Sequence, residues 1–558
     1  MMLPFILTCL CGGLLASGQP NEHGYIQHDE TIHDTENDGS MSFTAAVYQH
    51  DTLNWLLPSI SREEALRLMN INVDTYEEQI ITAASKGVSM IVFPEYGITG
   101  LKMSNTTVTA FLEFVPNPYE RKIIPCDSIQ LKDSPILQRL SCLAKNYSMV
   151  VIANLAAKKP CKKTSQAPDC PPDGMYKFNT DVAFGADGQL VAKYNKIKLY
   201  SEERTWFQPG RGVENLGVFQ TEFGVFGLFT CFDMLFEQPA ELLVHGMGIT
   251  NMVFPTGWMN ELPLLSAVEY QQAWAISFDV NLLAANIQLP LFHFTGGGLY
   301  NGAKGAVVYH YNMTEYKGVL VVGKLPIRKQ RAANMNSTDM KNTLKQIKKL
   351  TPKELLKVSP VVRAIFTEGS EISPLQEARK KMHEATHPLS PLQSSPSCDK
   401  PFISLMNHDP YTFTLLMEQS ARTSVCSKGL CCYLNYTFNA NSTHIELFAL
   451  GVFNDLHINN GQYYIQTCAL VKCKFQIKYS CGAETEQSKN RFESFSLRGE
   501  GFDPSTVLFP SVLTSGVQLP VIGKEWESPS PHDRVWSDSG TREPLLEASV
   551  FGRLYSKD

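Results

Sequence analysis

The apolar residues of the first half of the chain form short runs that alternate with segments of helical periodicity. Ser61 and Glu64 make a capping box, which predicts a helix from there to Gly87, and a second helix is expected over residues 262–278. Strands are expected over residues 43–48, 88–93, 149–154, 251–254 and 281–286, with a hairpin formed by 181–184 and 189–194. This alternation between residues 43 and 325 predicts a layered α/β domain with a mostly buried sheet.

Beyond residue 325 the pattern changes twice. Residues 326–400 form a lysine-rich segment, with six lysines and one glutamate in 341–358, and predict a solvated linker or insert. A surface that binds anions is the alternative interpretation of this segment. From residue 401 to 558 short alternating strands and turn signals predict a second, β-rich domain, and its clustered cysteines indicate that disulfides staple it.

The amino-terminal residues predict export. Residues 1–18 are apolar and end in the small residues Ala16-Ser-Gly18, which is typical of a signal peptide, and residues 19–42 are polar, acidic and expected to be disordered. Asn-x-Ser/Thr sequons, which are candidate glycosylation sites, follow in the rest of the chain at Asn105, Asn146, Asn312, Asn336, Asn435 and Asn441. A secreted, extracellular glycoprotein is expected.

The charge and hydropathy of the chain argue against nucleic acid and a membrane span. The net charge of -6 argues against a nucleic-acid partner. After the leader there is no apolar run of the length that spans a membrane, so no membrane span is expected. The last residues, Phe551 to Asp558, lack the hydrophobic tail of a GPI signal.

Twelve of the 14 cysteines lie beyond the leader, and in a secreted chain most of them are expected in disulfides. The close spacing of Cys426, Cys431 and Cys432 would suit a metal site in a cytosolic protein, but an oxidising compartment favours disulfides. If Cys231 is set aside for chemistry, an odd number remains. Cys398, in a Pro/Ser-rich stretch, is the candidate for the unpaired thiol.

Three residues at predicted strand ends carry the candidate chemistry: Glu95, Lys196 and Cys231. Cys231 ends an apolar run and precedes a helix-like segment, a position where backbone N–H groups converge and favour a thiolate. Taken singly, each has an ordinary alternative, namely a buried structural cysteine, a surface carboxylate and a solvated lysine. Their order along one α/β domain favours a common site.

Hydrolysis of an amide needs the parts that this trio supplies. The Cys231 thiolate is the predicted nucleophile, and Glu95 is the predicted base that accepts its proton and returns it to the leaving amine. Lys196 is the predicted proton donor on the oxyanion side, where the backbone N–H of Phe232 joins it. A buried carboxylate and a buried ammonium also compensate each other's charge.

One further motif has the form of a zinc-protease helix, His383-Glu384-Ala-Thr-His387. Its flanks are a charged linker, and Pro388 disfavours helix at His387, so coincidence is the preferred interpretation. Neither a Gly-x-Ser-x-Gly elbow nor a Walker A sequence is present in the chain.

The sequence motifs around the trio resemble those of the nitrilase (carbon–nitrogen hydrolase) superfamily, and in particular those of its biotinidase and pantetheinase (vanin) branch. The resemblance rests on Phe93-Pro-Glu95, Lys193-Tyr-Asn-Lys196, Thr230-Cys-Phe-Asp233, Phe254-Pro-Thr-Gly-Trp-Met-Asn-Glu-Leu-Pro263, Gly429-Leu-Cys-Cys-Tyr-Leu434 and Phe551-Gly-Arg-Leu-Tyr555, and it runs from about residue 43 to the end. It implies an αββα sandwich with an appended β-rich domain. It also implies Glu95 as base, Lys196 beside the oxyanion and Cys231 as nucleophile, with no metal and no organic cofactor.

The same resemblance implies a small-molecule or peptide amide as substrate. Release of biotin from biocytin or biotinyl peptides is the first expectation, and cleavage of pantetheine to pantothenate and cysteamine is the alternative. An alternative of another class is a secreted binding protein on a catalytically retired scaffold. The intact trio favours the enzyme.

Overall fold

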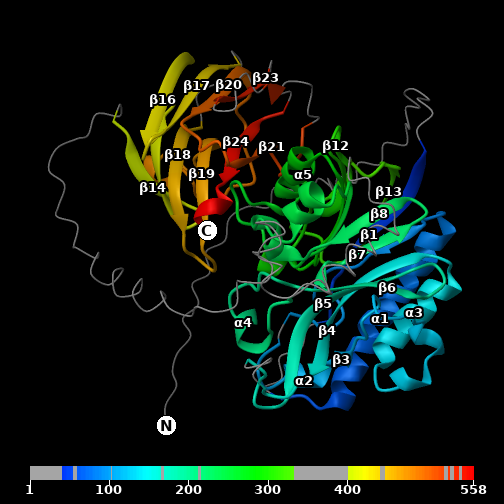
Figure 1. Cartoon of the computed structure of the whole chain (residues 1–558). Helices are drawn as coiled ribbons and strands as arrows, with labels where there is room; N and C mark the ends of the chain where they lie inside the picture. Colours follow the sequence, from blue (N-terminus) through cyan, green and yellow to red (C-terminus); the bar gives the residue numbers. More distant parts are fainter. Residues whose placement is uncertain are drawn as a thin grey trace, which may run out of the picture. The chain divides into compact units, whose positions relative to one another are not determined.

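The computed structural model describes residues 41–53, 59–101, 103–164, 169–211, 215–331, 400–439, 446–520, 526–527, 533–538 and 543–558, which lie in one compact unit (Figure 1). Several sequence predictions lie outside the described residues: the leader, the acidic segment up to residue 40, and residues 332–399 with Cys398 and the His383–His387 motif. The sequons at Asn336 and Asn441 lie outside them as well.

The first part of the chain builds two sheets. In the first sheet the order is β13-β1-β2-β4-β5-β6, with β3 beside β4. Strands β1, β2 and β4 run parallel, and Ala45, Met90 and Val150 occupy one register row. The strands are β1 (Ser42–Gln49), β2 (Met90–Val92), β3 (Glu113–Phe114), β4 (Val150–Pro160), β5 (Met175–Phe184), β6 (Leu190–Asn195) and β13 (Val319–Pro326).

The second sheet repeats this plan, with parallel strands in its centre and antiparallel strands at both edges. Its order is β12-β11-β10-β9-β8-β7, and β8, β9 and β10 are parallel. The strands are β7 (Val218–Thr221), β8 (Gly224–Leu228), β9 (Asn251–Pro255), β10 (Asn281–Ala285), β11 (Gly297–Asn301) and β12 (Gly305–His310).

An apolar layer joins the two sheets, and helices cover their outer faces. Val47, Met90 and Ile152 of the first sheet pack with Val253 and Leu283 of the second. The helices are α1 (Arg62–Ser85), α2 (Val108–Phe111), α3 (Pro135–Asn146), α4 (Glu203–Trp206) and α5 (Ala267–Phe278). Helices α1 and α3 pack on the first sheet and α5 on the second, so the predicted αββα sandwich is confirmed (Figure 1).

The last part of the chain is built from antiparallel strands in two further sheets, β14-β15-β18-β19-β24-β21 and β16-β17-β20-β23-β22. They enclose an apolar core of their own, which includes Leu434, Phe448, Leu497 and Val550. The strands are β14 (Phe402–Met406), β15 (Asp409–Leu415), β16 (Ser420–Ser427), β17 (Leu430–Phe438), β18 (Phe448–His457), β19 (Tyr463–Lys472), β20 (Phe492–Glu500), β21 (Val507–Thr514), β22 (Trp526–Glu527), β23 (Asp533–Asp538) and β24 (Leu545–Arg553).

Five disulfides are present among the described residues, some between neighbouring strands and some in loops. The pairs are Cys126–Cys142, Cys161–Cys170, Cys426–Cys431, Cys432–Cys468 and Cys473–Cys481. The Cys432–Cys468 bond joins the two carboxy-terminal sheets, from β17 to β19. Of the described cysteines only Cys231 is free. Among the helices of the described residues, none is both long and apolar enough to cross a membrane.

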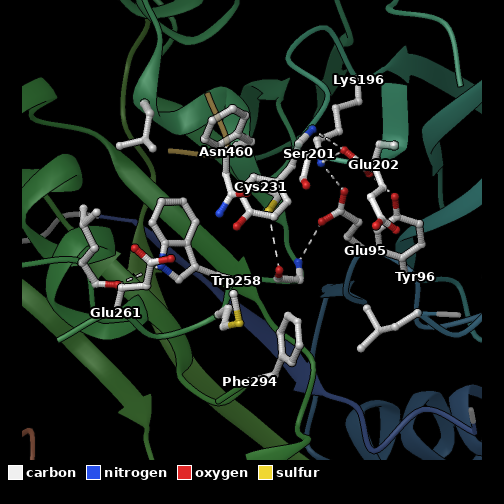
Figure 2. A pocket seen from close by; sticks show the side chains of 18 of the residues that line it. Glu95, Tyr96, Lys196, Ser201, Glu202, Cys231, Trp258, Glu261, Phe294 and Asn460 are labelled. Carbon is white, nitrogen blue, oxygen red and sulfur yellow. Dashed lines mark hydrogen bonds and ion pairs between the residues drawn. The ribbon is translucent and has the colours of Figure 1, made fainter. Parts of the chain in front are cut away.

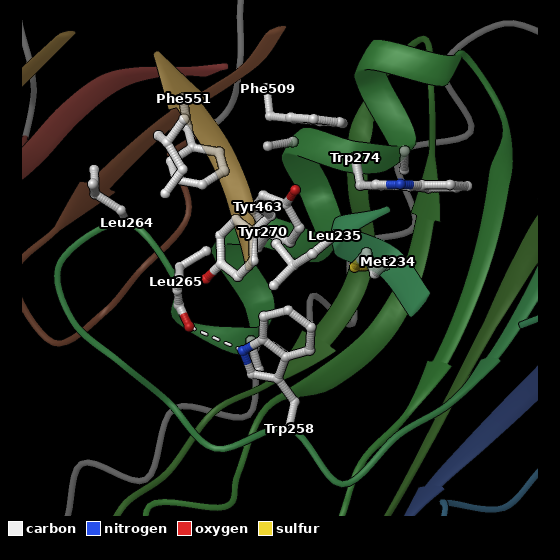
Figure 3. Packing of buried hydrophobic residues seen from close by; sticks show 14 of the residues in the cluster. Met234, Leu235, Trp258, Leu264, Leu265, Tyr270, Trp274, Tyr463, Phe509 and Phe551 are labelled. Atoms are coloured by element: carbon white, nitrogen blue, oxygen red, sulfur yellow. Dashed lines mark hydrogen bonds between the residues drawn. The ribbon is translucent and has the colours of Figure 1, made fainter. Parts of the chain in front are cut away.

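Helix α5 packs against both the sandwich and the carboxy-terminal region. Tyr270 and Trp274 of α5 pack with Phe509 of β21 and Phe551 of β24, in one core with Leu235 (Figure 3). A single apolar core therefore extends from the second sheet of the sandwich into the carboxy-terminal region.

Two predicted helical features differ from the structure. The helix expected over 262–278 begins only at Ala267, because Leu262 to Leu265 form a turn in which Glu261 and Leu265 bond each other's backbone. The helix-like segment expected after Gln238-Pro239-Ala240 is only a short π-helical turn, Leu242–Gly246, and Cys231 itself begins one turn of 3₁₀-helix, Cys231–Leu235. The helix opened by the Ser61–Glu64 capping box is confirmed.

A buried carboxyl pair joins α5 to β24 and predicts a pH-dependent stability. Glu547 accepts a hydrogen bond from Leu264 N at 2.6 Å. Burial, and then the neighbouring Glu269, raise the pKa of Glu547 well above its ordinary value. The folded state therefore keeps a proton that the unfolded chain releases at about pH 4.3, so this contribution to stability is lost as pH rises through the folded-state pKa.

We expect Glu547→Gln, which resembles the protonated acid, to flatten the alkaline decline of the Tm. Between the two pKa values the difference from the wild type is at most about 1.4 kcal/mol per pH unit. Thermal melts between mildly acidic and alkaline pH measure it, with the exposed Glu493→Gln as the matched control. Parallel pH curves for wild type and Glu547→Gln would contradict the raised pKa of Glu547.

Candidate active site

The structure brings the three predicted residues into one buried site (Figure 2). Glu95 lies three residues beyond β2, Lys196 directly follows β6, and Cys231 lies three residues beyond β8. Glu95 and Lys196 are each 1% exposed, and Cys231 is 9% exposed. All three line one cavity of about 290 Å³. The surface carboxylate and the solvated lysine that the sequence left open are thereby excluded.

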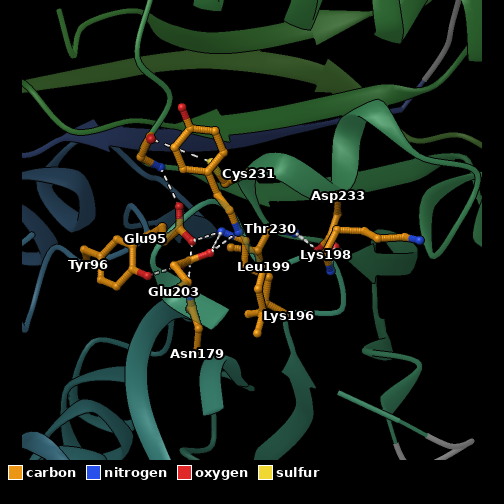
Figure 4. A network of polar contacts seen from close by, with 12 residues as sticks. Glu95, Tyr96, Asn179, Lys196, Lys198, Leu199, Glu203, Thr230, Cys231 and Asp233 are labelled. Atoms are coloured by element: carbon orange, nitrogen blue, oxygen red, sulfur yellow. Dashed lines mark hydrogen bonds and ion pairs between the residues drawn. The ribbon is translucent and has the colours of Figure 1, made fainter. Parts of the chain in front are cut away.

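The Lys196 ammonium lies between two carboxylates. Its Nζ is 2.7 Å from Glu95 Oε1 and 2.8 Å from Glu203 Oε2 (Figure 4). Burial alone would lower the pKa of Lys196, but Glu203 and Glu95 outweigh it and raise that pKa well above its usual range. Lys196 is therefore a permanent cation in the resting site, and it holds the two acidic side chains together.

Glu95 is fixed by donors on both oxygens. Oε1 also accepts from Asn179 Nδ2 at 2.7 Å, and Oε2 accepts from the backbone N–H of Gly257 at 2.9 Å. Burial raises the pKa of Glu95, and the charge of Lys196 opposes that rise. A carboxylate that is buried and held in this way is a suitable acceptor for a proton, because its protonated form is less costly than that of a solvated carboxylate.

Glu203 was not predicted from the sequence. Besides Lys196, it accepts hydrogen bonds from the backbone N–H of Tyr200 at 2.7 Å, from Asn179 Nδ2 at 3.0 Å and from the hydroxyl of Tyr96. The sequence contains one signal for it, the pair Glu202-Glu203, which lies six and seven residues after Lys196 at the start of α4. Without the fold, that pair is indistinguishable from an ordinary helix amino-terminus.

Cys231 occupies a strained turn. Its φ is 46°, in the left-handed region that non-glycine residues rarely adopt, and Thr230 caps the turn through Asp233. Thr230 Oγ1 donates to Asp181 Oδ2 at 2.6 Å, and Asp233 accepts from Tyr194 OH at 2.7 Å. These buried carboxylates hold the turn, and the Cys231 Sγ contacts Gly257 O at 3.6 Å.

The expectation that the local geometry favours a thiolate is wrong for the resting site. Burial and then the Glu95 carboxylate raise the pKa of Cys231, and Lys196 opposes them only in part. One turn of 3₁₀-helix also provides little dipole to stabilise an anion. The resting nucleophile is a thiol, so deprotonation has to accompany attack.

Phe232 places a backbone N–H next to the nucleophile. It is the second residue of the 3₁₀ turn, where N–H groups have no partner within the turn. The Phe232 ring packs under Gly461, where an added Cβ would lie 2.5 Å from the ring. A loop of the carboxy-terminal region thus fixes the residue that carries the predicted oxyanion donor.

The pocket has walls from both parts of the chain. Trp258 and Leu265 form apolar surface. From the carboxy-terminal region come His457 at the end of β18, Asn460 in the following loop and Tyr463 at the start of β19. Within the described residues, no cluster of three or more His, Cys, Asp or Glu side chains could hold a metal ion. The absence of a metal and of an organic cofactor, which the sequence led us to expect, stays a prediction.

Comparison with known proteins shows the family to which the chain belongs. The carbon–nitrogen hydrolase family matches residues 44–257, and the Vanin C-terminal domain matches residues 401–558. Human pantetheinase is 38% identical over 520 residues, which cover 93% of this chain and 90% of its own. Bovine biotinidase is 36% identical over 568 residues, 99% of this chain and 98% of its own, and mouse biotinidase is 37% identical over 560 residues with the same coverage.

A solved nitrilase-superfamily structure, Nit3 of Saccharomyces cerevisiae, is 17% identical, covers 56% of this chain and 96% of its own, and has a TM-score of 0.39. A score this low adds nothing to the assignment, which rests on the sequence relatives. They define a carbon–nitrogen hydrolase, a thiol amidohydrolase in its chemistry. Within that class, the chain belongs to the family of biotinidases and pantetheinases (vanins).

The raised pKa of the Cys231 thiol has a measurable consequence. Below a thiol's pKa the thiolate fraction rises about tenfold per pH unit, and the thiolate is the form that iodoacetamide alkylates. We expect the alkylation rate at Cys231 to climb steadily from neutral to alkaline pH without a plateau. Peptide mass spectrometry at each pH measures it, and a fast, pH-independent rate at neutral pH would show a pre-formed thiolate instead.

Proposed function

We propose that Cys231, Glu95 and Lys196 carry out amide hydrolysis through an acyl-enzyme on Cys231. The observation that supports this most directly is the convergence of a thiol, a carboxylate and an ammonium in one buried pocket, with Lys196 Nζ 2.7 Å from Glu95. A retired binding site would have no use for an ammonium held at high pKa beside a thiol.

In the proposed first half-reaction, Sγ attacks the amide carbon as its proton passes to Glu95. The carbonyl oxygen becomes an oxyanion, which the Phe232 N–H and Lys196 stabilise. An ammonium has three N–H donors, and the two carboxylates occupy two of them, so one remains for the oxyanion. Glu95 then gives its proton to the leaving nitrogen as the carbon–nitrogen bond breaks.

In the second half-reaction, water attacks the thioester carbon and Glu95 takes its proton. The carbon–sulfur bond breaks, the acid product leaves, and Cys231 recovers its proton. Glu203 is a positioning residue in this scheme, because it touches Lys196 and the Asn179 amide that also holds Glu95. Its second negative charge keeps Lys196 protonated while Glu95 is transiently neutral.

For the substrate we propose a biotinyl amide such as biocytin, cleaved to biotin and lysine. Support comes from the biotinidase relatives, whose alignments span 99% of this chain. Pantetheine is the second candidate, since human pantetheinase shares 38% identity over 93% of the chain. Both substrates present an amide of a small, partly apolar acid to the same nucleophile.

We also propose that the protein is secreted and N-glycosylated. Asn105, Asn146 and Asn435 are exposed, Asn312 is half-buried, and five disulfides suit an oxidising compartment. Glycosidase-sensitive protein in the culture medium is the expected observation. Recovery only from the cytosol, without glycan mass, would contradict this location.

Two substitutions separate chemistry from architecture. Cys231→Ala is expected to abolish turnover and leave the Tm nearly unchanged, because the contact of Sγ with Gly257 O is long, 3.6 Å, and alanine keeps the Cβ. Lys196→Ala is expected to abolish turnover and also cost about 3–5 kcal/mol of stability, because it leaves two buried carboxylates without their cation. Product assays and thermal melts on both variants test this pair, and full activity in Cys231→Ala would refute the nucleophile.

The substrate is decided by kcat/KM for a biotinyl amide and a pantothenyl amide, measured side by side. We expect the biotinyl amide to be preferred. Differences of a few buried groups change such ratios by about 1–3 kcal/mol, so a tenfold preference is within reach of pocket shape. A tenfold preference for the pantothenyl amide would replace biotinidase activity with pantetheinase activity and keep the mechanism.

A further inference from the structure

A further carboxylate, that of Glu261, lines the pocket away from the Glu95–Lys196–Glu203 cluster. Figure 2 shows Glu261 beyond Trp258, on the other side of Cys231 from Glu95. Its backbone is fixed: the N–H donates to Leu265 O at 3.3 Å, and the carbonyl accepts from Leu265 N at 3.1 Å and from Asn407 Nδ2 at 2.9 Å. Within the described part of the chain, its carboxylate forms neither a hydrogen bond nor an ion pair.

The charge of Glu261 acts on the same side chains as the nucleophile. Burial raises the pKa of Tyr200, and the charges of Glu261 and then Cys231 raise it further. Burial also raises the pKa of Tyr463, where Arg553 opposes and Glu261 adds to the rise. Tyr200 and Tyr463 both line the pocket. A cation that enters here meets a carboxylate and aromatic rings, the surroundings that stabilise ammonium and guanidinium groups.

Burial raises the pKa of Glu261, and the charges of His408 and His457 oppose that rise without forming an ion pair with its carboxylate in the described residues. Lys196 is shared by two carboxylates, so that cluster is itself negative when both are ionised. Glu202 adds a further acidic side chain to the lining. Arg553, behind Tyr463, is paired with Asp558 at 2.7 Å. Acidic groups that line a cleft with apolar walls focus a negative potential inside it.

His457 is the one histidine among the described lining residues, and both its nitrogens are engaged. Nδ1 lies 2.8 Å from Asp409 Oδ2, and Nε2 lies 2.7 Å from Asn459 O. These two contacts hold the ring, and neither of them is with the Glu261 carboxylate.

We propose that Glu261 is a subsite for a positively charged group of the substrate, an ammonium or guanidinium on either the amine part or the acyl part of the amide. This deepens the proposed function and rests on it, because the cation is carried by the amide that Cys231 attacks. Of the two candidate substrates, biocytin carries an ammonium and pantetheine does not. The same field disfavours anionic amides and favours departure of the acid product as its carboxylate.

Charged thiol reagents test the subsite without any amide substrate. An aminoethyl and a sulfonatoethyl methanethiosulfonate modify Cys231 at rates that sample the local potential with opposite sign. For charges about 8 Å apart in a water-like medium, removal of one negative charge changes the ratio of the two rates about fivefold. We expect Glu261→Gln to lower the cation-to-anion ratio by this factor, with modification followed by mass on the Cys231 peptide.

The matched controls fix the interpretation. Glu222→Gln removes an exposed carboxylate in the turn between β7 and β8, outside the pocket lining, and is expected to leave the ratio unchanged. Glu261→Asp keeps the charge and is expected to keep most of the ratio, which also covers the case that Glu261→Gln folds poorly. A ratio that is the same in Glu261→Gln and in wild type overturns the proposal, and it does so whether or not the protein hydrolyses biotinyl amides.

Matched amide pairs then identify which part of the substrate carries the cation. Biotin aminoethyl amide and its N-acetyl form differ by an ammonium on the amine part, and aminohexanoyl anilide and its N-acetyl form differ by one on the acyl part. Binding is measured to Cys231→Ala, with and without Glu261→Gln. A preference for the charged member that disappears with Glu261 assigns the cation to that part; no Glu261-dependent preference in either pair overturns the subsite.

Discussion

The buried ammonium of Lys196 is the interaction on which the rest of the site depends. A cation this far from water is stable only with close counter-charges, and Glu95 and Glu203 supply them at 2.7 and 2.8 Å. Removal of Lys196 leaves two buried carboxylates without a counter-charge, whereas removal of one carboxylate leaves a single buried ion pair. The arrangement therefore fixes the protonation of Lys196, while Glu95, whose second oxygen contacts Gly257 N, remains the group that can exchange a proton.

The same network also reaches the nucleophile. Asn154 Nδ2 donates to Asn179 Oδ1 at 2.7 Å and to Asp181 Oδ1 at 2.8 Å, and Asp181 in turn accepts from Thr230, the residue before Cys231. A polar chain under the floor of the site thus connects the base to the turn that bears the thiol. The position of Cys231 depends on buried side chains that never meet the substrate, and each of them would be costly to leave without its partner.

Much of the fold and the catalytic trio could be predicted from the sequence. The supporting residues and the protonation of the nucleophile could not, for physical reasons. Strands and the first helix followed from periodicity and a capping box. The catalytic trio followed from residue types at the ends of β2, β6 and β8, which the two packed sheets bring to one pocket. Glu203 and Asn179 escaped because their role lies only in three-dimensional contact with Lys196 and Glu95. The thiolate expectation failed because sequence shows neither the depth of burial of Cys231 nor the shortness of its helix.

The carboxy-terminal region contacts and supports the turn of the hydrolase sandwich that carries the nucleophile. Its Arg553, fully buried, donates through Nε to Leu235 O at 2.7 Å, at the end of the turn that begins with Cys231. Gly461 lies against the Phe232 ring so closely that no side chain would fit between them. The turn that carries Cys231 is therefore held by contacts with the sandwich and by contacts with the carboxy-terminal region. Because that contact also builds one wall of the pocket, loss of the carboxy-terminal region would remove substrate selection and the support of the oxyanion donor together.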